Sequence, residues 1–425
     1  MRRLLFVGLL LLLAGCAAPH AEETGLEPTV GEVDGVTHNQ SIDVTAEDGF
    51  TEQELDLLVK RSMARIEVLR ELPFERLVDV EVLSREEYRD RRRNRSVEET
   101  RRQWENQVWE GLFIVGEDRD VTAVRDQTFG ESVQGFYLPG RGRIVIVSDS
   151  ETPTVDKRTL VHELVHALQD QQFGLRDRPP TQDGQMARNG VVEGEASLLP
   201  RLYLDRCDDE WTCVRPETED SGGEVDPGLF QVVIYPYTQG PMFVETIQAR
   251  DGWEGVDGLH ETLPESTEQV IHPEKYPDED PIAVNVTDRS SAEWSRIDHD
   301  PDGERLGEAA VFSMLAVNEV IEAGSREYRH PASAGWGGDE LVPYRGDDGF
   351  GYVWELAWDT EEDAAAFHDA YRDLLSSHDA EQVGENRYVI SDGPFEDAFR
   401  VTRDGHTVRV VNAPTPDQLR EIHGG

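Results

Sequence analysis

The chain has 425 residues, which is enough for one large domain or two of ordinary size. It contains 87 acidic and 41 basic residues, so its formal charge is −46. Because nucleic-acid phosphates and anionic lipid head groups would be repelled by such a chain, we expect neither as a direct partner.

The N-terminus has the pattern of an export signal. Arg2 and Arg3 precede an apolar run, residues 4–13, that is too short to span a bilayer. Residues 13–16, Leu-Ala-Gly-Cys, resemble a lipobox, which implies a lipoprotein signal over residues 1–16, cleavage before Cys16 and lipid on its thiol. The paired arginines also resemble, less completely, a twin-arginine signal. We therefore expect the protein on the extracellular face of the membrane, held by its lipid anchor alone.

The segment after the signal predicts no fold of its own. Residues 17–47 are acidic, contain few aromatic residues and are rich in Ala, Glu, Gly, Thr and Pro, a composition typical of a disordered tether. Order is expected to begin near Phe50. A helix follows, opened by the capping-box pair Thr51 and Glu54 and closed by Pro73.

The next elements are read from hydrophobic periodicity. Residues 77–83 alternate like a strand, and the highly charged stretch 85–108 predicts a solvated helix. Residues 133–138 and 143–147 flank the turn 139–142, Pro-Gly-Arg-Gly, and predict a β-hairpin. This hairpin could bind an extended substrate backbone at its edge or serve only as a pair in a structural sheet.

The chemical signal lies in the apolar stretch 159–168, Thr-Leu-Val-His-Glu-Leu-Val-His-Ala-Leu, which contains H-E-x-x-H. On a helix, positions i and i+4 share one face, so His162 and His166 can both bind one zinc ion. In metalloproteases with this pattern the residue equivalent to Glu163 is the general base for the zinc-bound water.

Catalytic zinc requires a third protein ligand and an open position for water. The chain after His166 is long enough to complete the helix, cross a loop and return on a second helix, roughly 185–204. Glu193 and Glu195 are the candidates on that helix. Two residues apart on a helix point about 200° away from each other, so only one of them can face the metal.

The four residues 193–196, Glu-Gly-Glu-Ala, resemble the Glu-Gly-x-Ala signature of the gluzincin metallopeptidases. This resemblance implies that Glu193 is the third ligand of one Zn²⁺ ion, with Glu195 as the fallback, and that Gly194 lets the two metal helices approach closely. It also implies an α+β fold in which a mainly helical, zincin-like core, residues 48–325, has a small sheet before the metal helix.

The chain also resembles a group of haloarchaeal surface lipoproteins described as H-E-x-x-H peptidases. An acidic surface with so few lysines is typical of salt-loving archaea, because high salt screens the self-repulsion. The only lysines are Lys60, Lys157 and Lys275. Beyond the lipobox and the metal residues, the resemblance rests on the motifs at 236–240, 266–273 and 335–339.

Other residues are candidates for supporting roles. Peptide hydrolysis needs a hydrogen-bond donor for the oxyanion, and the candidates are Tyr235, Tyr237 and His272. Of these we include Tyr237 and His272 among the expected site residues. Asp170, one turn beyond the second histidine, could orient a ligand imidazole or simply end a helix. Trp336, among glycines, could form a pocket wall or a tight turn.

The remaining features concern the C-terminal half. Cys207 and Cys213 are close in sequence and predict a disulfide in an exported protein. Residues 326–425 predict an α+β unit without chemistry of its own. Its expected elements are strands at 351–358, 388–390, 398–402 and 407–411, and helices at 360–375 and 415–422.

We interpret the sequence as an exported, lipid-anchored zinc metallopeptidase that hydrolyses peptide bonds in a peptide or protein substrate through a Glu-activated, zinc-bound water. The alternative is a non-enzymatic cell-surface lipoprotein that uses a peptidase-like scaffold for binding or structure. A third reading is a chance motif in a solute-binding lipoprotein.

Overall fold

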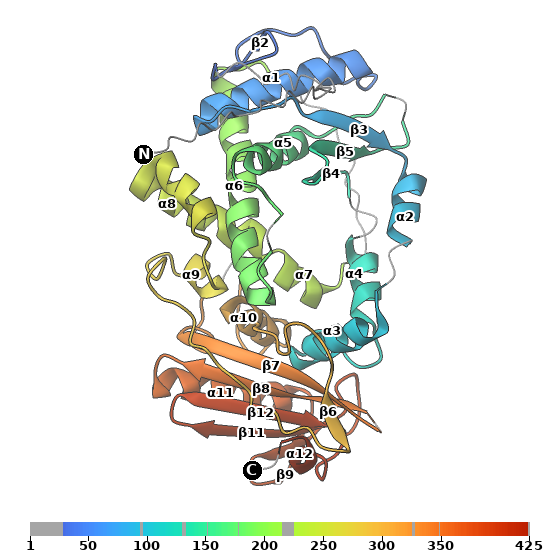
Figure 1. The fold of residues 1–425 in the computed structure, drawn as a ribbon, viewed down its shortest axis with the longest axis vertical. Coiled ribbons are helices and arrows are strands. Elements are labelled where there is room, and N and C mark those ends of the chain that lie inside the picture. Colours follow the sequence, from blue (N-terminus) through green and yellow to red (C-terminus); the bar gives the residue numbers. More distant parts are fainter. Residues whose placement is uncertain are drawn as a thin grey trace, which may run out of the picture.

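The computed structural model describes residues 29–93, 97–129, 133–150, 152–176, 178–214, 225–324, 328–347 and 349–423. The expected signal peptide, Cys16 and the first part of the expected tether lie outside these residues. Figure 1 shows an elongated molecule with the N-terminal helices and a small sheet at one end and a larger sheet at the other. The long helix α6 (Gln182–Asp209) runs from the N-terminal end toward the larger sheet.

The N-terminal part of the described chain is folded, so the prediction of a tether is wrong for residues 29–47. Strands β1 (Glu32–Val33) and β2 (Val36–Thr37) form a hairpin on α1 (Glu52–Arg70). The carboxylate of Glu67 on α1 accepts a hydrogen bond from the backbone of Gly31 at 2.9 Å. This segment is ordered because side chains of α1 satisfy its backbone, which composition does not reveal.

Helix α1 begins as expected, because Thr51 and Glu54 form both hydrogen bonds of a capping box. The stretch 85–108 instead contains two helices, α2 (Arg85–Arg93) and the start of α3 (Glu99–Gly111). The prediction of a solvated helix is therefore wrong for the second half of this stretch. Trp104, Val108 and Trp109 of α3 are buried in the main core, at helical spacing.

A three-stranded sheet comes before the helix that contains H-E-x-x-H. Its order is β3 (Asp79–Leu83), β5 (Arg143–Val147) and β4 (Gly135–Leu138), with β3 parallel and β4 antiparallel to the central β5. The predicted hairpin is confirmed as β4 and β5. Strand β4 is an edge of this sheet, and it faces α5 (Lys157–Gln172).

Helix α6 packs most closely on α8 (Tyr235–Glu261). A Cβ atom on Gly194 of α6 would lie 2.5 Å from the carbonyl carbon of Gly240 on α8, so the two backbones touch there. The expectation that Gly194 brings the two metal helices together is therefore wrong, because the glycine faces α8 and not α5. The other helices of this region are α4 (Val121–Phe129), α7 (Pro227–Val233), α9 (Thr267–Ile271) and α10 (Glu308–Val317).

The C-terminal sheet has seven strands and begins earlier than expected, because a strand at 294–296 belongs to it. Helix α11 (Glu361–Ser377) packs on the sheet, and α12 (Leu419–Ile422) lies near the end of the chain. The strand order is β6 (Trp294–Arg296), β7 (Trp336–Gly346), β8 (Phe350–Trp358), β12 (Thr407–Ala413), β11 (Ala398–Asp404), β10 (Arg387–Val389) and β9 (Glu381–Gly384), all antiparallel.

One hydrophobic core runs from α6 and α8 through α10 into this sheet. The boundary predicted at residue 326 therefore divides elements that share a core. The fold is α+β, as expected. Cys207 and Cys213 form the predicted disulfide. In the described part of the chain, no helix is both long enough and apolar enough to cross a membrane.

Candidate metal centre

The H-E-x-x-H residues lie on α5. Asp156 caps the helix, since its carboxylate accepts a hydrogen bond from the backbone of Thr159 at 3.0 Å. The apolar residues of the helix are buried in a core that includes α1 and the small sheet. This packing fixes the rotation of α5 and turns His162 and His166 together toward α6.

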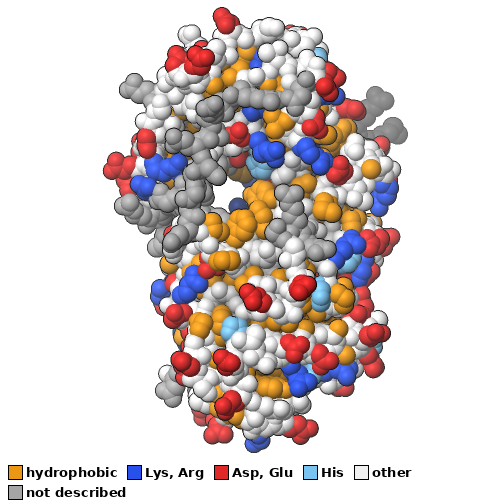
Figure 2. Space-filling model, turned by 180° about the vertical axis from the view of Figure 1, so that it is seen from behind, with side chains coloured by type: hydrophobic (Ala, Val, Ile, Leu, Met, Phe, Trp, Pro, Cys, Tyr) orange, Lys and Arg blue, Asp and Glu red, His pale blue; other side chains and the backbone are white. Residues whose placement is uncertain are grey.

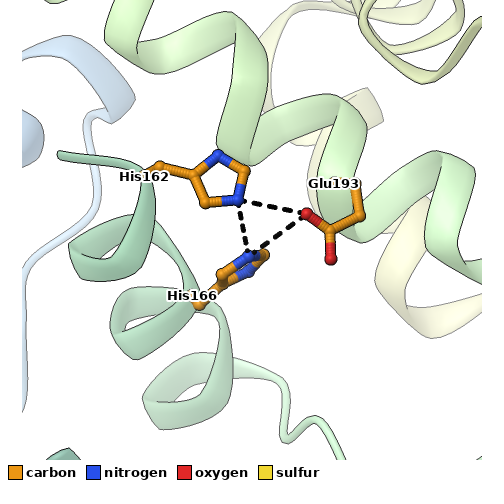
Figure 3. A group of neighbouring side chains, drawn as sticks. All are labelled: His162, His166 and Glu193. Atoms are coloured by element: carbon orange, nitrogen blue, oxygen red, sulfur yellow. Dashed lines mark hydrogen bonds and ion pairs between the residues drawn. The ribbon is translucent and has the colours of Figure 1, made fainter. Parts of the chain in front are cut away.

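Three ligand atoms from the two helices converge, as Figure 3 shows. Nε2 of His162 lies 3.1 Å from Oε2 of Glu193, and Nε2 of His166 lies 3.4 Å from the same oxygen. The two imidazole nitrogens are 3.1 Å apart. All three predicted ligands are thus brought to one point.

These separations suit a tetrahedral zinc ion. Ligand atoms bound at ~2.05 Å with tetrahedral angles lie about 3.3 Å from one another. The three measured separations, 3.1, 3.1 and 3.4 Å, are close to that value. The donor set of two imidazoles and one carboxylate is also one that zinc prefers in catalytic sites.

Gln169 fixes the tautomer of His166. The amide oxygen of Gln169 is 3.0 Å from Nδ1 of His166, while its amide nitrogen donates to the backbone oxygen of Val192 and the carboxylate of Glu195, at 3.0 and 2.8 Å. Because both partners of the nitrogen are acceptors, the oxygen must be the atom that faces the imidazole. His166 then donates from Nδ1, and Nε2 keeps its lone pair for a metal.

Glu195 does not face the two histidines, so of the two glutamates only Glu193 joins the cluster. The Glu195 carboxylate is buried on the other side of α6, where it lies 2.5 Å from Nε of Arg70 and 2.8 Å from Nε2 of His260. Burial alone would raise the pKa of Glu195, but the charge of Arg70 and the hydrogen bond from His260 lower it well below its usual range.

The charges of Glu193 and the two histidines stabilise one another. Burial alone would raise the pKa of Glu193, but attraction and hydrogen bonds from His166 and His162 lower it well below its usual range. Burial would likewise lower the pKa of His166, yet the charges of Glu193 and Glu163 raise it to about 9. Glu193 and Glu163 therefore favour a positive charge between these side chains, which either a proton on His166 or a divalent cation could supply.

The cluster opens into a cavity of about 420 Å³. His162, Glu163 and His166 line it from one side, and Gly135, Phe136 and Tyr137 of the edge strand β4 line it from another. A second cavity of about 520 Å³ shares Gln185, Asn189, Glu193 and Tyr237 as lining residues, so the two adjoin at the metal cluster. Figure 2 shows a hollow between the two ends of the molecule, with hydrophobic side chains along its lower edge.

Tyr237 reaches the cluster, whereas two other expected participants do not. The Tyr237 ring lies 6.1 Å from the His162 ring, and the residue as a whole is 43 % exposed. Desolvation of the hydroxyl group, the charges of Glu193 and Glu163 and a hydrogen bond with Glu193 raise the pKa of the phenol. His272 instead contacts Glu308 at 3.1 Å and lines neither cavity, so its expected role at the oxyanion has no geometric support. Tyr235 is buried and donates to the backbone oxygen of Thr267.

Asp170 and Trp336 also have other partners. Asp170 accepts hydrogen bonds from the Tyr137 hydroxyl at 2.8 Å and from the backbone of Leu175 at 3.1 Å, so it does not orient a ligand imidazole. Gln169 has that position, and its i+3 spacing from His166 is the signal that sequence reasoning missed. Trp336 is fully buried in strand β7, where its indole donates to Asp339, so it is neither a pocket wall nor a turn residue.

The comparisons with known proteins concern only the C-terminal part. Residues 295–423 match the model of a family described as a domain of unknown function (DUF8575). The match covers the seven-stranded sheet except for Trp294, the first residue of β6, and leaves α5 and α6 outside it. No curated protein and no solved structure gives a significant match to the chain.

Proposed function

We propose that the protein is a zinc metallopeptidase of the gluzincin type, in which His162, His166 and Glu193 hold one Zn²⁺ ion. The observation that carries the proposal is the convergence of these three ligand atoms within 3.4 Å of one another, beside Glu163 in the same cavity. Bound zinc would supply Lewis acidity, which polarises a carbonyl group and makes a water molecule more acidic.

Three side chains have the remaining proposed roles. Glu163 is the general base that takes a proton from the attacking water and later gives it to the leaving amine. Tyr237, whose hydroxyl group contacts Glu193 beside the cluster, donates a hydrogen bond to the oxyanion. Gln169 holds His166 in the tautomer that binds metal.

The surroundings of the cluster favour an extended peptide as substrate. Strand β4 is an edge strand and lines the cavity, so a peptide backbone could pair with its open side. The two adjoining cavities leave room on both sides of Glu193. A substrate with side chains on both sides of the cleaved bond is therefore consistent with the shape.

The proposed setting is the extracellular face of the membrane, with the lipid on Cys16 as the only anchor. The Cys207–Cys213 disulfide supports an oxidising compartment. Acidic side chains are scattered over the face seen in Figure 2, which fits a protein that stays soluble in high salt.

The variant Glu163→Gln tests this function. We expect full zinc content, because Glu163 is not a ligand, and a loss of peptidase turnover of about 10³-fold or more. Zinc is measured by atomic absorption and turnover with a quenched fluorescent peptide library in high salt. Glu254→Gln, an exposed acid on α8, is the matched control and should keep wild-type turnover.

Two outcomes would contradict the proposal. Purified protein without stoichiometric zinc would refute the metal centre. The second outcome is a wild type that holds stoichiometric zinc, hydrolyses no peptide and binds peptides as tightly as Glu163→Gln does. That result would support a binding lipoprotein on a peptidase-like scaffold.

A further inference from the structure

A second group of acids lies far from the zinc candidates, between α3 and the C-terminal sheet. Glu110 of α3, Glu117 of the following loop and Asp397 just before β11 place carboxylate oxygens within 4.8 Å of one another. We call these three residues the acidic triad. Glu110 and Asp397 are buried, Glu117 is exposed, and all three line one cavity.

No basic side chain neutralises the acidic triad among the described residues. Glu110 accepts a hydrogen bond from the amide of Gln107, and Asp397 accepts one from the amide of Asn412 at 2.7 Å. The carboxyl groups of Glu110 and Asp397 also hydrogen-bond to each other, which requires that they share a proton. Burial, with the nearby charge of Glu117, raises the pKa of Asp397 to about 8. Buried carboxylates in such a setting need either protons or a cation.

An independent observation indicates a ligand at this place. Gln107 is 5 % exposed and lines the same cavity, and its amide oxygen has no hydrogen-bond partner within the described chain. While the Glu110 carboxyl is ionised, it accepts from the amide nitrogen of Gln107, which leaves the amide oxygen without a donor. A buried carbonyl oxygen without a donor is costly, and a cation would satisfy it.

The rest of the protein provides a comparison within the same chain. Glu268, Glu279 and Asp359 form a second group of three carboxylates, also within 4.8 Å. There the ammonium group of Lys275 contacts all three, at 2.7, 2.6 and 2.9 Å. The ammonium group of Lys275 thus neutralises this second group of acids. By contrast, none of the ion pairs of the described residues involves the acidic triad.

We propose that the acidic triad and the amide oxygen of Gln107 bind a divalent cation of the calcium class. The donors are all oxygens, which Ca²⁺ prefers, and none is the nitrogen or sulfur that distinguishes zinc sites. The exposed side of Glu117 leaves room for water to complete the coordination.

The cation would join two parts of the fold. The backbone of Glu117 donates to the backbone oxygen of Pro394 at 2.9 Å, and a Cβ on Gly116 would lie 2.3 Å from that oxygen, so the two loops are in direct contact. Glu110 and Glu117 belong to the helical side, and Asp397 belongs to the sheet. Bound calcium therefore stabilises the junction between the helices and the C-terminal sheet.

The test titrates CaCl₂ into the full chain by calorimetry after dialysis into calcium-free buffer with high NaCl, which screens diffuse binding to the acidic surface. We expect one saturable site in the wild type. The double variant Glu110→Gln/Asp397→Asn should lose at least about 30-fold in calcium affinity, because two of the charged ligands are gone. The control Glu254→Gln/Glu261→Gln removes the same charge from exposed positions and should bind calcium like the wild type.

Thermal unfolding separates a calcium site from a purely structural acid cluster. With calcium the wild type should unfold at a higher temperature than without it, and the double variant should show no shift. Without calcium the double variant should be about as stable as the wild type near pH 7, because burial and the charge of Glu117 raise the pKa of Asp397 to about 8, so that its carboxyl is already largely uncharged there. Glu117→Gln, at an exposed position, should fold normally and weaken calcium binding about tenfold.

Three results would overturn the inference: a wild type without saturable calcium binding, equal calcium affinity in wild type and Glu117→Gln, or a double variant whose unfolding temperature still rises with calcium. Replacing CaCl₂ with MgCl₂ tests the class, since the irregular donor set should bind Mg²⁺ more weakly. Tighter binding of Mg²⁺ would contradict the calcium assignment.

Discussion

The amide oxygen of Gln169 lies 3.0 Å from Nδ1 of His166, one helical turn away on α5. The amide nitrogen of Gln169 reaches across to α6, where it contacts Val192 and Glu195. The imidazole of His166 is therefore held by a side chain that also joins α5 and α6. Because Glu195 contacts Arg70, this support extends as far as α1.

We predict that Gln169→Leu lowers zinc affinity by about 10- to 100-fold, the usual effect of removing a hydrogen-bond partner from a ligand histidine. Zinc dissociation constants are measured by competition with a chromogenic chelator. Asp170→Asn is the matched control on the next residue, and it should leave zinc affinity unchanged because Asp170 contacts Tyr137 and Leu175. Equal losses in both variants would show that the effect is loss of helix stability and not imidazole orientation.

We predict that Tyr237→Phe lowers kcat by about 10²-fold, as removal of one oxyanion donor does in other hydrolases, with little change in zinc content. Steady-state kinetics with a fluorescent peptide measure kcat and KM separately. The control is Tyr235→Phe, because the Tyr235 hydroxyl is buried and donates to Thr267. That variant should lose stability and keep kcat, so a loss of kcat in Tyr235→Phe alone would reverse the assignment.

The residues of the candidate metal site could be predicted from the sequence, but the contacts that position them could not. The spacing of His162 and His166 requires only the helical period, which holds in any fold. The choice between Glu193 and Glu195 depends on the rotation of α6, which is set by contacts with α8 and α1. The position of His272 beside Glu308 likewise results from packing between α9 and α10, which local pattern does not determine.

The fold shows the same contrast between elements that local sequence patterns predict and elements that tertiary contacts determine. Strong patterns such as the β4–β5 hairpin and the amphipathic helix α11 were predicted close to their true bounds. Residues 29–47 were assigned to a tether because their composition is polar, yet α1 supplies their hydrogen-bond partners. Strand β6, with three residues, is too short to carry a periodic signal and exists only because β7 pairs with it.

We predict that Gly194→Ala destabilises the protein by about 1–3 kcal/mol, although alanine is the better helix former. The added methyl group would lie 2.5 Å from a backbone atom of Gly240, so α6 and α8 must separate. Gly258→Ala on α8 is the control, because a Cβ there meets nothing within 4 Å in the described chain. It should stabilise the protein by up to about 1 kcal/mol. Denaturant unfolding in high salt measures both, and destabilisation by both variants would refute the backbone contact.

Lys157, the first residue of α5, is buried with its ammonium group unpaired among the described residues. Burial, together with the positive charges of Arg61 and Arg65, lowers its pKa from the usual 10.5 to about 7. Between these values the unfolded chain binds more protons at this site than the folded protein. The contribution of Lys157 to the free energy of unfolding must therefore rise with pH from about 7 to 10.5, by up to about 1.4 kcal/mol per pH unit.

Lys157→Met should consequently be more stable than the wild type at pH 7, and the difference should shrink as the pH approaches 10. Denaturant unfolding across this range measures it. Lys60→Met gives the opposite sign, because hydrogen bonds and charge from Asp34 and Asp56 raise the pKa of Lys60. That variant should be less stable than the wild type at neutral pH, with a difference that persists until Lys60 loses its proton. A stability gap for Lys157→Met that does not change with pH would mean that the ammonium group stays charged in the folded protein.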